Sequence, residues 1–270
     1  MSPTAAAPHA ELTLLDGRLA PTADTVIPVT DQGFIRGDGV FEVIRVYEGA
    51  PFALDEHLDR MERSAHNLRL GYEVPRARLE EEAAQLLEAR GGRAFDGALR
   101  IILTIAGRRL LMTEPMPAMP ASVRLGFVTY APTRVLDGIK SLSYAANMLC
   151  TRLARERGFD EALLVTPHGR VLEAPTSSFF WAGEDGVLST PPLDDHILAS
   201  ITRAHIMRLV DVEERVTTWE DVRGAREAFL ASTLRDVQPV AAIEEHELTA
   251  PGELSRAAAE AMRTHVASAI

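Results

Sequence analysis

The sequence predicts an α+β protein of mixed α/β character, organised as two domains. Strand-like and helix-like patterns alternate irregularly along the 270 residues. Hydrophobic residues make up 46% of the chain and charged residues 25%, which is typical of globular proteins. The pattern of the sequence changes near residue 131, where residues 131–138 resemble a connector between domains. We therefore expect a smaller N-terminal domain at 1–133 and a larger C-terminal domain at 134–270.

The N-terminal region begins with patterns typical of strands. Asp16-Gly17 follows residues 11–15 and suits the tight turn of a hairpin. Residues 40–47 read VFEVIRVY, in which β-branched and aromatic side chains alternate with others, so this run predicts a strand.

Two helices and two further strand-like runs complete the predicted N-terminal domain. Asp55 can cap a helix that ends before Gly71, and a second helix is predicted at 78–90. The second helix turns four apolar side chains inward, namely Leu79, Ala83, Leu86 and Leu87. Strand-like runs at 99–105 and 123–130 flank the proline-rich stretch 112–120, which we predict to be a loop.

The C-terminal region alternates helices with short strands. Gly158 ends one predicted helix, and Ser200 can cap another that runs to about Leu209. The predicted helices are 144–157, 201–209 and 253–267, and the predicted strands are 162–165, 170–174, 179–181, 187–189 and 228–231.

Composition excludes several classes of function. The formal charge of −11, with arginines scattered among acids, argues against a nucleic-acid binder. No run approaches the ~20 apolar residues of a membrane helix, and residues 1–10 lack the pattern of a signal peptide. Cys150 is the only cysteine, so it cannot form an internal disulfide or a thiolate metal site. We therefore expect a cytoplasmic protein without a bound metal.

The most informative single residue is Lys140, the only lysine in the chain. All other basic residues among the 28 lysines and arginines are arginine, which stays charged and cannot act as a nucleophile. A lysine amine can lose its proton and attack a carbonyl carbon. The sequence lacks a Walker phosphate loop, a G-x-G-x-x-G helix start, an H-E-x-x-H motif and a G-x-S-x-G elbow. With these motifs excluded, the chemistry that the sequence still indicates is that of the Lys140 amine.

Six segments in order resemble the class IV aminotransferases, the pyridoxal 5'-phosphate (PLP) family that includes branched-chain and D-amino acid aminotransferases and aminodeoxychorismate lyase. The resemblance covers the chain from Asp31 to about Val240. Its segments are DQGFIRGDGVFEVIRVYEGAPFALDEHLDRMERSA (31–65), KSLSYAANML (140–149), GFDEALLVTPHGRVLEAPTSSFFW (158–181), GVLSTPPL (186–193), SITR (200–203) and FLASTLRDVQPV (229–240). The resemblance implies a two-domain fold, a homodimer, and a PLP site at the domain interface.

The resemblance also implies roles for individual residues. Lys140 would hold the cofactor's aldehyde covalently and move a proton between carbons, and Glu173 would keep the ring nitrogen protonated. Arg60 would bind the phosphate through its planar fork. The remaining cofactor residues implied are Ser178, Ile201, Thr202, Ser232 and Thr233. Relatives usually carry Asn where Ser178 stands and Gly where Ser200 stands, and both changes keep a small residue.

The substrate is less well defined than the cofactor. The Arg-x-His carboxylate trap of D-amino acid enzymes is absent after residue 105, and branched-chain enzymes have Tyr where Arg36 stands. Candidates for binding substrate are Arg36, Phe41, Arg45, Arg108 and Arg109, and at least two of the arginines are expected to be ordinary surface or interface residues.

These residues favour an aminotransferase that acts on an amino acid, of D- or branched-chain type, and a 2-keto acid. Three alternatives stay open: an aminodeoxychorismate lyase, which eliminates pyruvate, an (R)-selective amine transaminase, and a cofactor-binding protein without catalysis. Such lyases often have Thr where Glu42 stands, so Glu42 favours transamination.

Overall fold

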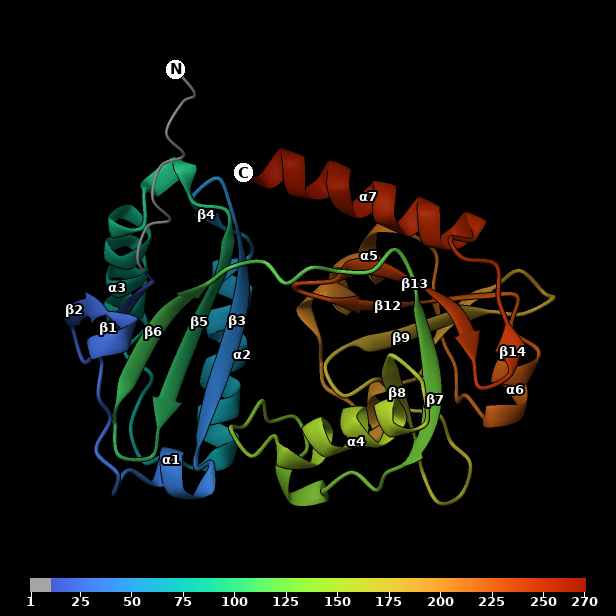
Figure 1. Cartoon of the computed structure of the whole chain (residues 1–270), viewed down its shortest axis with the longest axis horizontal. Coiled ribbons are helices and arrows are strands. Elements are labelled where there is room, and N and C mark those ends of the chain that lie inside the picture. The colour runs from blue at the N-terminus through green and yellow to red at the C-terminus, as the bar shows by residue number, and fades with distance from the viewer. Residues whose placement is uncertain (1–10) are drawn as a thin grey trace. The chain divides into compact units, whose positions relative to one another are not determined.

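The computed structural model describes residues 11–270, which divide into two compact units (Figure 1). The first unit comprises the described residues up to Met116 together with Lys140–Leu142. The second comprises Pro117–Ile139 and Ser143–Ile270. The predicted boundary at 133/134 falls inside the segment Pro117–Ile139. The expectation about a signal peptide concerns residues 1–10, which lie outside the described part of the chain.

The first unit is built on a six-stranded antiparallel sheet in the order β2-β1-β6-β5-β3-β4. The strands are β1 (Leu12–Leu15), β2 (Arg18–Pro21), β3 (Gly39–Tyr47), β4 (Ala50–Pro51), β5 (Gly97–Thr104) and β6 (Arg109–Glu114). The predicted hairpin is confirmed, since Leu15 pairs with Arg18 and the two turn residues, Asp16 and Gly17, both have positive φ.

Two long helices cover one face of this sheet (Figure 1). The helices of the unit are α1 (Gln32–Arg36), α2 (Leu54–Leu68), α3 (Arg76–Ala89) and the 3₁₀ turns Thr22–Asp24 and Gly92–Ala94. α2 packs on β3, and α3 packs on β6 and β1. The four predicted apolar residues of α3 are all buried, which confirms its inward face.

Two details of the predicted N-terminal domain are wrong. Residues 112–114 belong to β6 and not to a loop, because the prolines begin only at Pro115 and the strand ends there. Asp55 does not cap α2, whose N-cap is Ala53 at φ 53°. The Asp55 carboxylate instead accepts a 2.9 Å bond from Arg76, at the start of α3.

The second unit contains an eight-stranded mixed sheet in the order β11-β10-β9-β12-β13-β7-β8, with β14 paired to β13. The pairs β7–β8, β13–β7 and β10–β11 are parallel, and the others are antiparallel. The strands are β7 (Val123–Thr129), β8 (Glu161–Val165), β9 (Ser178–Ala182), β10 (Leu188–Thr190), β11 (Glu213–Glu214), β12 (Glu227–Ser232), β13 (Asp236–Ile243) and β14 (His246–Glu247).

The helices of the second unit pack on this sheet. They are α4 (Ala145–Glu156), α5 (Ile201–Leu209), α6 (Trp219–Arg223), α7 (Glu253–Ala269) and the 3₁₀ turns Arg134–Leu136 and Leu193–Asp195. α4 lies on β7 and β8, and α7 packs against β12, β13 and α5. The helices predicted at 144–157, 201–209 and 253–267 are confirmed within a few residues, but 170–174 forms only isolated bridges. None of the helices among residues 11–270 is both long and apolar enough to cross a membrane.

α7 begins on a carboxylate that comes from the sheet. Glu227 of β12 accepts bonds from the backbone N–H groups of Leu254, at 3.1 Å, and Ser255, at 3.0 Å. The N-cap residue itself, Gly252, has no side chain to offer. Glu227 therefore satisfies two of the N–H groups that a helix start leaves without intrahelical partners, and its charge suits the helix dipole.

We expect Glu227→Ala to lower the free energy of unfolding by about 1–2 kcal/mol, because two N–H groups at the helix start, one buried and one partly buried, lose their acceptor. Urea denaturation measures this change. Glu260→Ala is the matched control, since Glu260 is an exposed glutamate of the same helix whose ion pair to Arg263 should contribute only about 0.5 kcal/mol or less. Equal losses in the two variants would contradict the capping role.

Candidate functional site

Lys140 belongs to a short stretch, Lys140–Leu142, that is part of the first unit, although the segments before and after this stretch belong to the second. Its backbone N–H donates to Ser64 Oγ at 3.1 Å, and its carbonyl accepts from Phe41 N at 3.1 Å. The next residue, Ser141, forms an antiparallel bridge with Val40 of β3. The Lys140 amine lies 4.2 Å from the centre of the Phe41 ring. The lysine is thus fixed to the edge of a rigid strand through its main chain.

A buried ionic cluster lies between β3 and α2 of the same unit. Glu42 is fully buried, and its two carboxylate oxygens accept from Arg60 Nε at 2.7 Å and Arg60 Nη2 at 2.5 Å. His57 Nδ1 lies 2.7 Å from Glu42 Oε2, and both basic residues are at most 5% exposed. The predicted phosphate ligand, Arg60, is therefore oriented by a bidentate carboxylate.

Burial and charge compete in this cluster. Burial by itself would raise the pKa of Glu42, but the charge and hydrogen bonds of Arg60, with those of His57, outweigh it and lower the pKa to about 2. Burial lowers the pKa of His57, and this effect exceeds the opposing influence of Glu42. The ionised carboxylate and the uncharged imidazole are the favoured states of the folded protein.

These shifts predict an acid-labile fold. Below about pH 6.5 the unfolded chain binds a proton at His57 that the folded protein disfavours, and below about pH 4.5 the same applies to Glu42. Stability should therefore be constant near neutral pH, fall below pH 6.5, and lose about 3 kcal/mol from Glu42 between pH 4.5 and 2. Urea denaturation across this range measures the loss. A Glu42→Gln variant should show a flatter profile below pH 4.5, and an unchanged slope would contradict the assignment.

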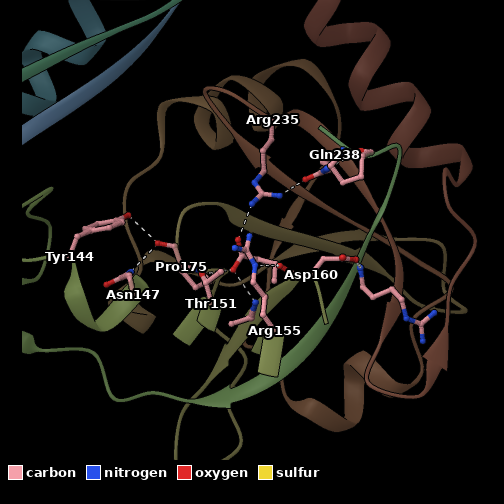
Figure 2. A network of polar contacts seen from close by, with 12 residues as sticks. Tyr144, Asn147, Thr151, Arg155, Asp160, Pro175, Arg235 and Gln238 are labelled. Carbon is pink, nitrogen blue, oxygen red and sulfur yellow. Dashed lines mark hydrogen bonds and ion pairs between the residues drawn. The ribbon is translucent and has the colours of Figure 1, made fainter. Parts of the chain in front are cut away.

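Glu173 of the second unit comes just before a turn at residues 175–176 that side-chain hydrogen bonds hold in place. Its carboxylate accepts a 3.1 Å bond from Leu198 N, three residues before α5. The carbonyl of Pro175 in the following turn accepts from Tyr144 Oη at 3.0 Å and from Asn147 Nδ2 at 2.9 Å (Figure 2). The start of α4 thus fixes the turn that follows the predicted ring-nitrogen partner.

Ser177 and Ser178 follow the same turn. Both side chains are buried, with 5% and 1% exposure. Neither hydroxyl oxygen has a hydrogen-bond partner among the described residues. A buried hydroxyl without a partner costs free energy, so these groups suit a bound polar ligand.

The predicted helix after Ser200 and its Ser200 cap are confirmed, and anion binding at its start stays a prediction. Ser200 is the N-cap of α5, and its hydroxyl accepts from Arg203 N at 3.3 Å. Ile201 and Thr202 form the first turn and are 7% and 6% exposed. The first N–H groups of a helix lack acceptors within the helix, so those of Ile201 and Thr202 can serve an anion.

Ser232 and Thr233 lie at the hairpin turn that joins β12 to β13. Ser232 pairs with Asp236, and the preceding residue, Ala231, pairs with Ser178 of β9. The second unit therefore places its predicted cofactor residues on neighbouring segments. Glu173 accepts a hydrogen bond from Leu198, just before α5, and Ser178 pairs with Ala231, the residue before Ser232.

The candidate substrate residues lie in different surroundings. Arg45 donates to Asp96 at 2.6 Å and to the carbonyls of Val46 and Gly97, while Arg109 binds Glu82 through two bonds of 2.9 and 3.2 Å. Arg108 donates to Asp16 at 2.5 Å with its side chain 37% exposed. Arg36 is the exposed last residue of α1, and Phe41 is buried beside Lys140. Within the first unit, Phe41 is the member of this set that lies against the lysine amine, at 4.2 Å from ring centre to Nζ.

Sequence reasoning missed several residues that hold the site together. The sequence indicates Glu42 only as a marker of subclass and does not point to His57, although both lie within the segment 31–65 that carries the resemblance. Asn147 and Pro175 were also missed. A polar residue in a strand flanked by apolar ones, such as Glu42, is a usable signal, because a buried carboxylate needs a buried cation. Among residues 11–270, no three histidine, cysteine or acidic side chains are grouped to hold a metal ion.

Comparison with known proteins agrees with these features. Residues 39–243 match the family described as amino-transferase class IV. A branched-chain-amino-acid aminotransferase from Methanocaldococcus jannaschii, named as putative, is 31% identical, with 85% of this chain and 87% of that protein covered. A D-alanine aminotransferase from Bacillus licheniformis is 29% identical, with 94% and 97% covered. An aminodeoxychorismate lyase from Bacillus subtilis is 29% identical, with 85% and 86% covered.

Solved structures show the same fold. The branched-chain aminotransferase from Thermoproteus uzoniensis, solved with norvaline, superposes with a TM-score of 0.86 at 26% identity, covering 95% of each chain. The predicted α+β fold class and the resemblance are both confirmed. The match spans most of the described sheet and helix elements of both units. The chain therefore belongs to the class IV aminotransferases, a family of PLP-dependent enzymes.

Proposed function

We propose that this enzyme is a PLP-dependent aminotransferase that moves an amino group between an amino acid, of D- or branched-chain type, and a 2-keto acid by a ping-pong mechanism. The observation that carries the proposal is the placement of Lys140. The only lysine of the chain is fixed to β3 through its main chain, and its amine, the group that can form a bond to an aldehyde, lies against the Phe41 ring.

The residues present fit the cofactor. The buried hydroxyls of Ser177 and Ser178 have no partner among the described residues, which supports a polar ligand beside them. The phosphate requires fixed donors, and the proposal assigns this role to Arg60, to the N–H groups of Ile201 and Thr202, and to the hydroxyls of Ser232 and Thr233.

PLP, when bound, withdraws electrons from the amino acid's Cα and carries the amino group between the two half-reactions. In the proposed mechanism the Lys140 amine takes the proton from the amino acid's Cα. It later gives a proton to the cofactor carbon that carries the nitrogen. Glu173, whose carboxylate accepts from Leu198 N, would keep the cofactor's ring nitrogen protonated. The first keto acid leaves before the second substrate binds, which gives ping-pong kinetics.

Exposure favours Arg36 and Arg108 among the candidates for the substrate carboxylate, because a substrate must reach the guanidinium. Arg45 and Arg109 have less exposed side chains, at 11% and 22%, and like Arg108 they pair with acidic residues of the first unit. Phe41, beside the lysine amine, is the proposed apolar contact.

The strongest alternative is aminodeoxychorismate lyase activity, supported by the relative from Bacillus subtilis. The role of Glu42 favours transamination, since threonine, common at this position in such lyases, has no carboxylate to bind Arg60 and His57. An (R)-selective amine transaminase is the third candidate.

Incubation with D-alanine, L-leucine, (R)-phenylethylamine and aminodeoxychorismate, with 2-oxoglutarate as acceptor where one is needed, separates these activities. Keto acid formation from D-alanine or L-leucine supports the proposal. Pyruvate release from aminodeoxychorismate alone would favour the lyase, and a protein that binds PLP without turning over any donor would have no catalytic role. We also propose a cytoplasmic homodimer, and light scattering on the purified protein tests the dimer.

A further inference from the structure

The turn that contains Ser232 and Thr233 also contains Arg235, whose side chain ties the turn to β8. Arg235 N donates to Ser232 O at 3.1 Å, and Asp236 completes the turn with a φ of 50°. The Arg235 side chain leaves the turn and binds Glu161, the first residue of β8, with 2.9 Å between Nη2 and Oε2. A residue two positions from Thr233 is thus tied to a different strand of the sheet.

Glu161 is 3% exposed and serves three donors. Besides Arg235, its carboxylate accepts from Thr151 Oγ1 of α4 at 2.6 Å and from Ala162 N at 3.0 Å. Gln238 of β13 accepts from Arg235 Nη1 and donates to Pro120 O at 3.0 Å (Figure 2). The network therefore joins the turn to α4, β8, β13 and the chain that leads into β7.

A largely buried ion pair of this kind is a poor source of stability, because both charges lose most of their hydration. It does fix geometry, because a guanidinium fork accepts few orientations of a carboxylate. We propose that Glu161 and Arg235 are positioning residues that hold the Ser232–Thr233 turn in place for the cofactor's phosphate. This inference rests on the proposed function and assigns a role to two residues that contact neither substrate nor cofactor.

The test compares two ligands that differ only in the phosphate. Dissociation constants for PLP and for pyridoxal, measured by absorbance titration of the full-length protein, separate loss of the phosphate site from general damage. We expect Glu161→Gln and Arg235→Met to weaken PLP binding by about tenfold or more, while pyridoxal binding changes by less than about threefold. Inorganic phosphate should also compete less well with PLP in these variants.

Two further variants keep the test decisive. The double variant Glu161→Leu/Arg235→Met removes both charges together and leaves no buried ion without a partner, so it should fold and still show the selective loss of PLP. Arg124→Met is the matched control, since Arg124 forms an exposed ion pair with Glu247 in the same unit and should leave both constants unchanged.

Equal weakening of PLP and pyridoxal, or PLP affinity within about twofold of the unaltered protein, would overturn the positioning role. If the unaltered protein binds neither compound, the proposed function fails and the inference fails with it. If the unaltered protein binds PLP and only the variants behave otherwise than expected, the inference alone is overturned.

Discussion

Lys140→Ala should abolish both the visible absorbance of the PLP-loaded protein and its transaminase activity. A lysine-bound PLP absorbs in the visible violet, and alanine can neither bind the aldehyde nor move a proton. With both functions lost, we expect the turnover rate to fall by roughly 10⁴-fold or more. Absorbance spectra and donor-dependent keto acid formation measure the two effects.

The structure indicates that this variant folds normally. The contacts that fix the segment come from the Lys140 main chain and from Ser141, and alanine preserves them. Lys140→Arg is the matched control, because it keeps the charge over the Phe41 ring but supplies no nucleophile. Both variants should lack the absorbance band of the lysine-bound cofactor, with little change in thermal midpoint. Activity, or that band, in either one would contradict the role of Lys140.

Glu42→Ala should be the most destabilising single change in the first unit. Removing this carboxylate leaves Arg60 buried without its bidentate partner and takes an acceptor from His57. Breaking a buried ion pair by deleting one partner costs about 3–5 kcal/mol, and a fully buried pair belongs to that class. Urea denaturation at pH 7.5 without added cofactor measures the loss free of ligand linkage.

Two controls locate the effect in the buried cluster. Glu81→Ala removes a glutamate of α3 whose side chain is 71% exposed, and it should change stability by about 0.5 kcal/mol or less. A double variant, Glu42→Leu/Arg60→Met, should be more stable than Glu42→Ala, because no buried charge remains without a partner. A loss below about 1 kcal/mol in Glu42→Ala would show that the cluster tolerates an uncompensated arginine.

Local patterns predicted most of the fold. The turn at Asp16-Gly17, the inward face of α3 and the Ser200 cap all depend on residues close together in sequence, and each is confirmed. The errors also have local causes. The prolines after Glu114 obscured the end of β6, and Asp55 has a long-range partner, Arg76, that competes with capping.

The candidate site was only partly predictable for a different reason. Composition singled out Lys140, and the family resemblance supplied roles for Arg60 and Glu173, which remain predictions. The contacts that support these residues join distant parts of the chain, as between Val40 and Ser141 or between Arg235 and Glu161. No periodicity in a single sequence reveals such pairs, because the two partners of each pair lie far apart along the chain.

The position of β7 sets an order for folding during synthesis. All strands of the first sheet are encoded before residue 115, so that sheet can form early on the ribosome. β7 follows at once in sequence, but one of its two neighbours is β13, which ends at Ile243. Until those last residues emerge, β7 presents an open edge that could pair with another nascent chain. The second unit is therefore where slow folding and aggregation during expression should concentrate, and lower expression temperatures or slower translation should benefit it most.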